Sequence, residues 1–416
     1  MEPGKYSFGI GDRFGLQGQA LLGAIMDARE MGVNLTPVWN KSYREHAIVG
    51  TTPADTRREA DEAVRELGWQ APYFVDADHI TLRIVDDFVD HADFFTVDVA
   101  EQLGKEPGKG ELDLFIHRHA GLIGPLRVPG IEEPFRVGRA ELERAGRRYL
   151  AALEETTRIY QLLVRNKGEG SFVLELSMDE TSEPQDPLDL LLILAEVGFR
   201  RIPLATIAPR FPGMLRKGVD FLGDLGAFHK SFRQVVAVIR FAVREFGLPK
   251  GFKVSFHSGS DKFSLYGTMR SVLQEFDAGL HIKTSGTTWL EELAGLAAVG
   301  GEGLAIAKEI YGKAYNRMAE LTAPYATVVE IDPRSLPLPE EVNRWDEERF
   351  VSCLTHDLEN PWYNEHFRQL LHVAYKIAAE AGTRFRELVL KHQDVISANV
   401  RRNILDRHIR PLFMGD

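Results

Sequence analysis

The chain has 416 residues, of which 44% are hydrophobic and 27% are charged, and its formal net charge is -11. This length suits one barrel-sized domain with additions or two to three smaller domains, and the ordinary globular composition excludes extensive disorder. The negative charge argues against a general nucleic-acid binder, because phosphate contacts need a basic surface.

The cysteine content and the apolar runs indicate in which cellular compartment the protein is expected. Cys353 is the single cysteine, which excludes an intrachain disulfide and gives no sign of an oxidising compartment. Its apolar neighbours favour a buried, unreactive thiol. No apolar run approaches the roughly 20 residues that cross a bilayer, and the first residues lack the long apolar region of a secretion signal. We therefore expect a cytoplasmic protein without a membrane partner.

The first 290 residues contain eight short strand-like runs, which alternate with segments of helical periodicity. Repeated strand–helix units indicate a parallel sheet, and eight of them predict an α/β fold closed into a (β/α)8 TIM barrel. The expected strands are 6–10, 34–39, 72–75, 94–99, 172–176, 201–207, 252–256 and 280–283. The expected helices are 19–31, 53–67, 82–91, 139–166, 187–197, 228–246 and 269–276, with a further start near residue 289.

An open, doubly wound sheet with a dinucleotide site is the alternative fold. It would require a glycine-rich phosphate-binding turn after the first strand. Gly9 and Gly11 supply two glycines of such a turn, but Phe14 occupies the place of the third. Two glycines alone are weak evidence for a dinucleotide, so the sequence favours the barrel.

Two regions depart from the strand–helix repeat. Residues 101–138, rich in glycine and proline, form a long excursion after the fourth strand, and loops of that length are usually functional or mobile. From about residue 300 the pattern is mostly helical. We expect residues 1–300 to form the catalytic barrel and residues 301–416 to form a helical extension packed on it. Within the extension we expect a short strand at 326–331 and helices near 340–348, 363–381 and 384–407.

Polar residues gather at the C-terminal ends of the predicted strands, the face at which (β/α)8 enzymes carry their active sites. Alternate residues of a strand point the same way, and the bulky apolar set should face the helices. This rule turns Glu175 of the fifth strand into the barrel. It also turns inward His257 of the seventh strand, and His281 and Lys283 of the eighth. Residues far apart in the sequence are thus directed at one space.

Imidazole nitrogens and carboxylate oxygens together form a common site for a divalent metal ion. We predict that Glu175, His257 and His281 hold such an ion. Asp76 and Asp78, which share a face of the third strand, are further candidates as ligands or bases. The alternative for either histidine is a hydrogen-bonding role behind the ligands. The donor set fits Zn, Mn, Fe, Co or Ni, so the identity of the metal stays open.

Lys283 is predicted to be catalytic, with three interpretations of its role. As a cation it would hold a substrate carboxylate or a developing oxyanion, which is the role we favour. With its pKa lowered by burial it would form a Schiff base. A structural salt bridge is the third interpretation.

Further polar residues beside the strand ends are candidates for holding a substrate, although exposed ion pairs contribute little by themselves. Asp179 follows the fifth strand and is either a proton carrier or a helix N-cap. The candidates for substrate binding are Asp12, Arg13, His79, Asp261, Lys262 and Thr284.

Several strings in the chain resemble the tagaturonate/fructuronate epimerase family, whose members are tagatose 4-epimerase-like. The resemblance extends from residue 6 to about residue 380 and is weakest in the 101–138 excursion. The matching strings are GIGDRFG (9–15), PYFVDADHI (72–80), LELSMDET (174–181), FHSGSDKF (256–263), HIKTSGTTWL (281–290), NPWYN (360–364) and FRQLLHV (367–373).

The resemblance implies a metal-assisted isomerase of hexuronate catabolism that interconverts D-tagaturonate and D-fructuronate by inverting the carbon β to the ketone. Related enzymes also handle fructose and tagatose, so the charge of the substrate stays open. Simple enolisation does not acidify the C–H bond of the β carbon. The resemblance therefore favours cleavage and re-formation of the adjoining C–C bond, with a metal ion stabilising an enediolate. Asp78 and Asp179 are the candidate proton carriers.

Other functions stay open at this point. Transient oxidation by a nicotinamide would invert the same carbon, but the chain lacks a convincing dinucleotide site. The remaining alternatives are a Schiff-base aldolase acting through Lys283, a metal-dependent aldose–ketose isomerase and a catalytically inactive sugar-binding barrel. The expected partner is a small sugar or sugar acid, without nucleic acid, and a homo-oligomer is left open.

Overall fold

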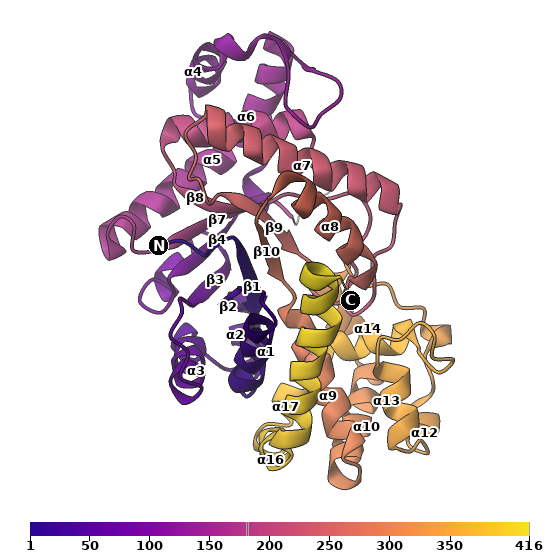
Figure 1. The fold of residues 1–416 in the computed structure, drawn as a ribbon. Helices are drawn as coiled ribbons and strands as arrows, with labels where there is room; N and C mark the ends of the chain where they lie inside the picture. The colour runs from indigo at the N-terminus through magenta and orange to yellow at the C-terminus, as the bar shows by residue number, and fades with distance from the viewer. Residues whose placement is uncertain (180, 182, 416) are drawn as a thin grey trace.

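The computed structural model describes residues 1–179, 181 and 183–415. Eight parallel strands close into a barrel in the order β1-β10-β9-β8-β7-β4-β3-β2 (Figure 1). The predicted TIM barrel is confirmed, and the open sheet is excluded. The barrel strands are β1 (Tyr6–Ile10), β2 (Thr36–Ser42), β3 (Phe74–Ile80), β4 (Phe94–Asp98), β7 (Val173–Ser177), β8 (Leu204–Ala208), β9 (Lys253–His257) and β10 (Leu280–Lys283).

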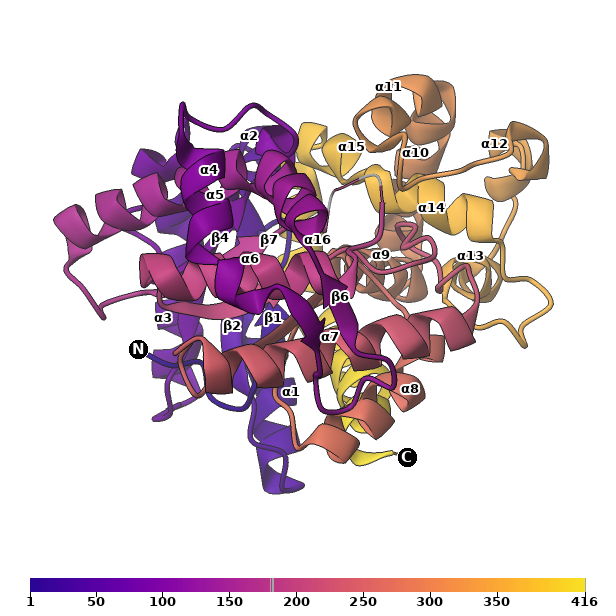
Figure 2. The ribbon, with the colours of Figure 1, turned by 90° about the horizontal axis from the view of Figure 1, so that it is seen from above.

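Helices follow the strands and cover the outside of the barrel (Figures 1 and 2). Local sequence fixes where several of them begin. The Thr52 amide and hydroxyl donate to the Asp55 carboxylate before a helix that starts with proline, and Asp186 caps another helix in the same setting. The helices are α1 (Gly18–Glu30), α2 (Tyr43–Val49), α3 (Pro53–Glu66), α5 (Arg139–Lys167), α6 (Pro187–Arg200), α7 (Leu225–Glu245) and α8 (Phe263–Phe276).

The predicted helix over residues 82–91 is wrong. The segment contains only a short 3-10 turn, Val85–Asp87. Backbone hydrogen bonds there join residues three apart, from the Ile84 amide to the Thr81 carbonyl and from the Phe88 amide to the Val85 carbonyl. Because β3 continues through Ile80, further than expected, consecutive tight turns span the remaining distance to β4.

The 101–138 excursion has secondary structure of its own. It contains α4 (Glu111–Arg118) and a small antiparallel hairpin of β5 (Gly124–Leu126) and β6 (Phe135–Val137). α4 contacts α5, and the excursion lies on the helical outside of the barrel (Figures 1 and 2). It does not line the cavity at the strand ends that is described below.

The last third of the chain is helical, as expected, and has its own apolar core, which includes Trp289, Tyr311, Phe350 and Phe367. α17 turns back and contacts α1 and α9, which fastens the extension to the barrel (Figure 1). The helices are α9 (Thr288–Ala298), α10 (Gly301–Asn316), α11 (Met318–Thr322), α12 (Pro339–Val342), α13 (Glu347–Leu354), α14 (Glu365–Val373), α15 (Tyr375–Glu380), α16 (Thr383–Lys391) and α17 (Gln393–Arg402), followed by a π-helix at Asn403–Met414.

The strand predicted at 326–331 is also wrong. One backbone hydrogen bond, from the Lys217 amide to the Val328 carbonyl (2.8 Å), joins the segment to the loop after β8. A single bond without a repeating register does not make a ladder, so the segment stays irregular.

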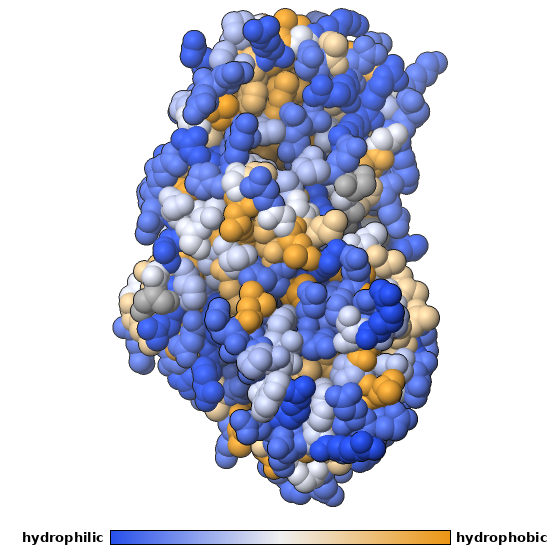
Figure 3. All heavy atoms as spheres, turned by 90° about the vertical axis from the view of Figure 1, so that its right-hand side faces the viewer, coloured by the Kyte–Doolittle hydropathy of each residue, from blue (hydrophilic) through white to orange (hydrophobic). Residues whose placement is uncertain are grey.

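One side of the surface is drawn in Figure 3. On the side drawn in Figure 3, hydrophilic side chains predominate and the apolar ones form scattered patches. None of the helices among the described residues is both long and apolar enough to span a bilayer.

Candidate active site

A cavity of about 630 Å³ lies at the C-terminal ends of the barrel strands. Its walls come from β3, β9 and β10, from α2, from the loop after β8, and from residues 324–328 of the C-terminal extension. The volume is typical of small-molecule sites. The extension therefore forms part of the cavity wall in addition to packing on the barrel.

Three side chains converge in this cavity. His79, Asp179 and His257 each present an atom able to bind a metal, and these atoms lie within 4.8 Å of one another. Nε2 of His79 is 3.5 Å from Oδ1 of Asp179, and Nδ1 of His257 is 3.1 Å from Oδ2. Both nitrogen atoms are buried, and neither makes a hydrogen bond to a described residue. Two such imidazoles beside one carboxylate form a donor set suited to a divalent ion.

A second carboxylate lies behind each histidine. Nδ1 of His79 is 2.9 Å from Oδ1 of Asp78, and Nε2 of His257 is 2.7 Å from Oε1 of Glu175. Carboxylates in this position fix the orientation of an imidazole and direct its other nitrogen toward a metal. Glu175 lies inside the barrel, where strand alternation puts it, but it contacts the far side of His257 and does not belong to the converging group.

An irregularity in β3 brings His79 into the site. The register between β3 and β4 shifts between Ala77 and Ile80, and His79 has a left-handed φ of 57°. Bulges re-aim side chains, and a left-handed residue other than glycine costs about 1 kcal/mol. Regular alternation would send Asp78 and His79 to opposite faces, whereas both line the cavity.

His281 lies one layer deeper in the barrel than the converging group. Strand register pairs His281 with Ser255, and it pairs Lys283 with His257. His281 is fully buried, and its Nδ1 is 2.9 Å from the Ser7 hydroxyl. Burial lowers its pKa to about 3, so the ring is neutral. The metal set of Glu175, His257 and His281 stays a prediction, and the geometry favours His79, Asp179 and His257.

Lys283 is surrounded by carboxylates. Its Nζ is 2.7 Å from Asp76, 2.9 Å from Asp78 and 3.1 Å from Glu175, and it donates a hydrogen bond to Thr96. Burial alone would lower the pKa of Lys283, but the three carboxylates raise it well above its usual value. The lysine is therefore a cation at neutral pH. A Schiff-base role would need the neutral amine.

The carboxyl groups around the cavity differ in protonation. Burial would raise the pKa of Asp179, but the positive charges of His257 and His79 hold it well below the usual range. The charges of His79 and Lys283 do the same for the pKa of Asp78. Burial raises the pKa of Asp76 to about 7. The site thus places two ionised carboxylates at the cavity and a group that titrates near neutrality beneath them.

Of the remaining predicted substrate-binding residues, Arg13 lines the cavity. It forms an ion pair with Glu45, and its guanidinium lies 4.6 Å from the ring centroid of Tyr375. Asp12 instead accepts hydrogen bonds from the amides of residues 14–17 and so fixes its own loop. Thr284 is fully buried and lies outside the cavity wall.

Asp261 and Lys262 also lie outside the cavity wall, and both are fully buried. Asp261 is 2.6 Å from Arg368, which belongs to the extension. The ammonium of Lys262 donates to the carbonyls of Arg216 (3.0 Å) and Val219 (2.8 Å), and burial lowers its pKa to about 7. Both side chains are engaged within the protein, so the structure offers no support for their predicted contact with substrate.

Several residues of the wall were not predicted from the strand ends, among them Arg44, Arg210, Lys217 and Tyr325. Arg44 lies on α2, Arg210 and Lys217 lie in the loop after β8, and Tyr325 lies in the extension. None of these four lies on a strand, so the alternation of inward and outward side chains along strands cannot predict that they face the cavity.

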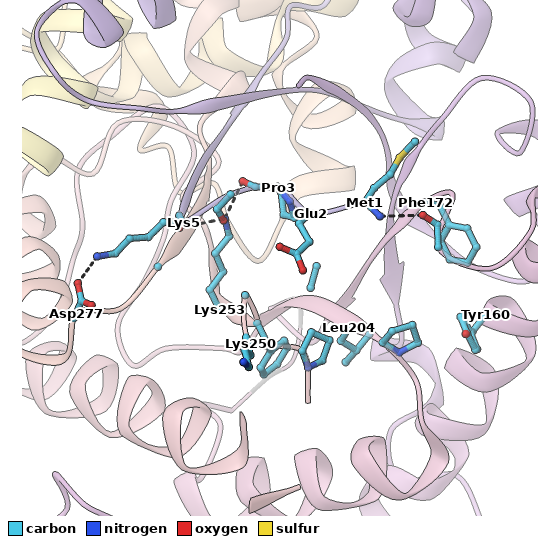
Figure 4. Close-up of a pocket in the computed structure, with 18 residues that line it drawn as sticks. Met1, Glu2, Pro3, Lys5, Tyr160, Phe172, Leu204, Lys250, Lys253 and Asp277 are labelled. Carbon is cyan, nitrogen blue, oxygen red and sulfur yellow. Dashed lines mark hydrogen bonds and ion pairs between the residues drawn. The ribbon is translucent and has the colours of Figure 1, made fainter. Parts of the chain in front are cut away.

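A second cavity, of about 510 Å³, lies at the opposite end of the barrel (Figure 4). Its wall includes residues 1–5 and Lys253, whose ammonium donates to the Gly4 carbonyl at 2.7 Å. The ion pair of Lys5 and Asp277 closes one side (Figure 4). In this fold the N-terminal face of the strands serves stability, and the converging group of His79, Asp179 and His257 is at the other end. We therefore assign the chemistry to the cavity at the C-terminal ends.

Comparisons with known proteins identify the family to which the chain belongs. Residues 1–116 and 126–411 match the family described as tagaturonate epimerase. A tagaturonate/fructuronate epimerase of Thermotoga maritima is 29% identical over 385 residues, which cover 89% of this chain and 73% of the relative. The crystal structure of a fructuronate-tagaturonate epimerase from Cohnella laeviribosi complexed with glycerol has a TM-score of 0.81 at 24% identity, covering 99% of this chain and 82% of that one. The native structure of that enzyme has a TM-score of 0.80 at 22% identity with the same coverage.

Proposed function

The chain belongs to the tagaturonate epimerase family of isomerases, and we propose that it interconverts D-tagaturonate and D-fructuronate with the aid of a divalent metal ion. The observation that carries the proposal is the convergence of His79, Asp179 and His257 at the wall of the barrel cavity. The tagaturonate/fructuronate epimerase of Thermotoga maritima supports the choice of substrates.

The residues present fit a metal ion. Nε2 of His79 and Nδ1 of His257 are buried without a hydrogen bond to a described residue, and both lie beside Asp179. A buried, unpaired polar atom is costly, so an ion at this point would relieve two such atoms at once. When bound, a divalent ion supplies Lewis-acid stabilisation of the negative charge that develops on substrate oxygens.

Side chains of the protein accept the hydroxyl proton that the reaction removes. Asp78, which lines the cavity between His79 and Lys283, takes the proton of the hydroxyl on the carbon to be inverted. Asp76, which shares Lys283 with Asp78 and has a pKa near 7, provides the next acceptor. Lys283 remains a cation that stabilises negative charge beside the substrate.

The proposed inversion gains and loses no atoms. Removal of the hydroxyl proton breaks the bond between the inverted carbon and its neighbour, so the inverted carbon becomes an aldehyde and the electron pair passes to the ketone fragment as an enediolate. The aldehyde turns its other face, the C–C bond re-forms, and the proton returns to the new alkoxide. The C–H bond of the inverted carbon is never broken.

Two measurements test the function. Metal-loaded protein is incubated in D2O with either uronate, and the products are resolved by NMR. We expect the other epimer without deuterium on the inverted carbon, whereas deuterium at that carbon would overturn C–C cleavage. The second measurement compares activity before and after exhaustive chelation. We expect loss of turnover and recovery with added metal, and full activity in metal-free protein would overturn the role of the ion.

An aldolase acting through Lys283 remains the second candidate. It would trap a covalent adduct at this lysine on borohydride reduction in the presence of substrate. We expect no adduct, because three carboxylates around Lys283 favour its protonated form.

A further inference from the structure

We propose that Asn40 and Ser285 form a subsite that binds one hydroxyl group of the substrate, the hydroxyl on the carbon between the inverted carbon and the carboxylate. This inference rests on the proposed function and adds the residues that recognise the sugar through neutral hydrogen bonds. Asn40 lies in β2 and Ser285 lies in the turn after β10, and both line the barrel cavity.

The Asn40 side chain has an acceptor without a partner. Asn40 is 6% exposed, and its Nδ2 donates a hydrogen bond to the Ser285 hydroxyl at 3.2 Å. Its Oδ1 is buried and accepts no hydrogen bond from a described residue. A buried polar atom without a partner is costly. Because Asn40 lines the cavity, a ligand there can supply the missing donor.

Together the two side chains present one acceptor and one donor. The Ser285 oxygen accepts the hydrogen bond from Asn40, which leaves its own O–H as a donor, whereas Oδ1 of Asn40 can only accept. A sugar hydroxyl donates one hydrogen bond and accepts others, so it matches both atoms. A carboxylate only accepts and would leave Oδ1 unpaired. The pair therefore suits a hydroxyl group and not the acid group of the substrate.

Two glycines make room for the pair. β1 lies between β2 and β10, so the contact of Asn40 with Ser285 bridges the end of β1. A Cβ at Gly11 would lie 2.6 Å from the Asn40 carbonyl oxygen, and a Cβ at Gly9 would lie 2.9 Å from Cγ of Lys283. Only glycine allows such close approach. The two glycines that the sequence offers as half of a dinucleotide turn thus let the neighbouring strand ends come together.

The subsite lies opposite Asp179 in the barrel. Three strands separate β1 from β7 in either direction around the sheet, and Asp179 follows β7. Lys283, two residues before Ser285, contacts Asp78, whose neighbour His79 belongs to the converging group. The Asp78–Lys283 pair therefore stands between the converging group and the subsite.

The order of these groups matches the order of the substrate's carbons. With the hydroxy-ketone beside the converging group and the inverted carbon beside Asp78 and Lys283, the next carbon reaches Asn40 and Ser285. The hydroxyl on that carbon belongs to the aldehyde fragment after the C–C bond breaks. Holding it keeps the fragment in the cavity, while rotation about the bond to the aldehyde carbon exposes the other face of the aldehyde.

The test compares D-tagaturonate with an analogue that lacks this one hydroxyl. The kcat/KM of the uronate and the kcat/KM or inhibition constant of the analogue are measured for the wild type, Asn40→Leu and Ser285→Ala. Both substitutions should lower kcat/KM for the complete uronate, by about ten- to a hundredfold for Asn40→Leu. The constant for the analogue should change less than threefold. The ring-closed fraction of each sugar is the same for every variant, so it cancels in this comparison.

Ser258→Ala is the matched control. Ser258 also lines the cavity, but its hydroxyl donates to the Lys283 carbonyl at 2.8 Å. This variant should keep the preference for the complete uronate within a factor of two of wild type. Ser285→Ala removes a single half-buried hydroxyl, so it keeps the test available if Asn40→Leu does not fold.

The outcomes separate this inference from the proposed function. Equal losses for the complete and the deoxy sugar, or no loss for the complete uronate, would overturn the hydroxyl assignment while leaving the epimerase proposal intact. Wild-type protein that fails to convert the uronate would overturn the proposed function and this inference with it.

Discussion

Two carboxylates, the half-buried Asp179 and the fully buried Asp261, are each flanked by two imidazoles near the same end of the barrel and differ in what surrounds them. Asp179 lies between His79 and His257 at the wall of the cavity. Asp261 lies between His356 (3.1 Å) and His408 (3.2 Å), in a setting without such an opening. The two groups are called here the Asp179 cluster and the Asp261 cluster.

The difference lies in the source of the positive charge. In the Asp261 cluster, Arg368 lies 2.6 Å from the carboxylate and donates also to the carbonyls of Gly218 and Leu354, both at 2.6 Å. A guanidinium from the extension thus neutralises Asp261 permanently. Around Asp179 the two facing nitrogen atoms have no hydrogen bond to a described residue, and the space between them opens on the cavity. The guanidinium of Arg368 indicates a structural role for the Asp261 cluster, whereas the opening of the Asp179 cluster on the cavity indicates a binding site.

The largest expected effect comes from removing a histidine of the Asp179 cluster. His257→Ala should lose the bound ion and reduce turnover by about 10³-fold, because the metal supplies several kcal/mol of charge stabilisation in the transition state. His79→Ala should behave in the same way. Metal content measured by mass spectrometry on the purified variants, beside initial rates, checks both expectations.

His281→Ala is the matched control for these variants. His281 is buried one layer deeper, with its Nδ1 beside Ser7. Its removal should cost stability while the ion is retained. Loss of the ion in His281→Ala, with a full complement in His79→Ala, would restore the metal set predicted from the sequence and refute the set favoured by the geometry.

The second prediction concerns the Asp261 cluster. Asp261→Asn leaves Arg368 buried without its counter-charge, which should reduce the free energy of unfolding by about 3–5 kcal/mol. Metal content and kcat of the folded enzyme should stay within a few-fold of wild type, because neither residue lines the cavity. Thermal denaturation and steady-state kinetics measure the two effects. Unchanged stability together with a large increase in KM would instead support the substrate-binding role predicted for Asp261.

The sequence alone could predict which side chains enter the barrel but not how deep they lie. Alternation correctly turns Glu175, His257 and Lys283 inward. The depth of a residue along the barrel axis depends on strand register, which places His281 beside Ser255 and below the cavity. Register follows from the closure of the whole barrel, so no local pattern reveals it.

The remaining differences between the predicted and the observed site have equally specific causes. His79 reaches the site because β3 has a bulge and a left-handed residue at that point, a backbone irregularity that alternation cannot represent. The cavity also takes Tyr325 from the extension, a contact between segments that are far apart in the sequence. The sequence predicts a substrate-binding role for Asp261, only four residues after His257, whereas its ion pair with Arg368 makes Asp261 structural.

The third prediction tests how metal binding by the Asp179 cluster depends on the carboxylate behind His257. Glu175→Gln keeps the size of the side chain but removes the charge behind His257 and beside Lys283. Loss of such a carboxylate typically weakens metal binding by about 10- to 100-fold. Competition with a calibrated chelator should show this change, and excess metal should recover much of the activity. Unchanged metal affinity would mean that Glu175 acts only through Lys283.

The last prediction concerns a charge at the other end of the barrel, where Lys253 donates to the carbonyls of Pro3, Gly4 and Lys5. Burial lowers the pKa of Lys253 to about 7 from its usual 10.5. Between these values the unfolded chain holds the proton more tightly than the folded protein, so this lysine makes stability rise with pH, by at most about 1.4 kcal/mol per pH unit. The difference in unfolding free energy between wild type and Lys253→Met should therefore increase in favour of wild type from pH 7 to pH 10, as measured by denaturant titration. A difference independent of pH would mean that the three carbonyls keep the ammonium charged throughout, and Lys253 would then resemble Arg368 as a permanently charged structural cation.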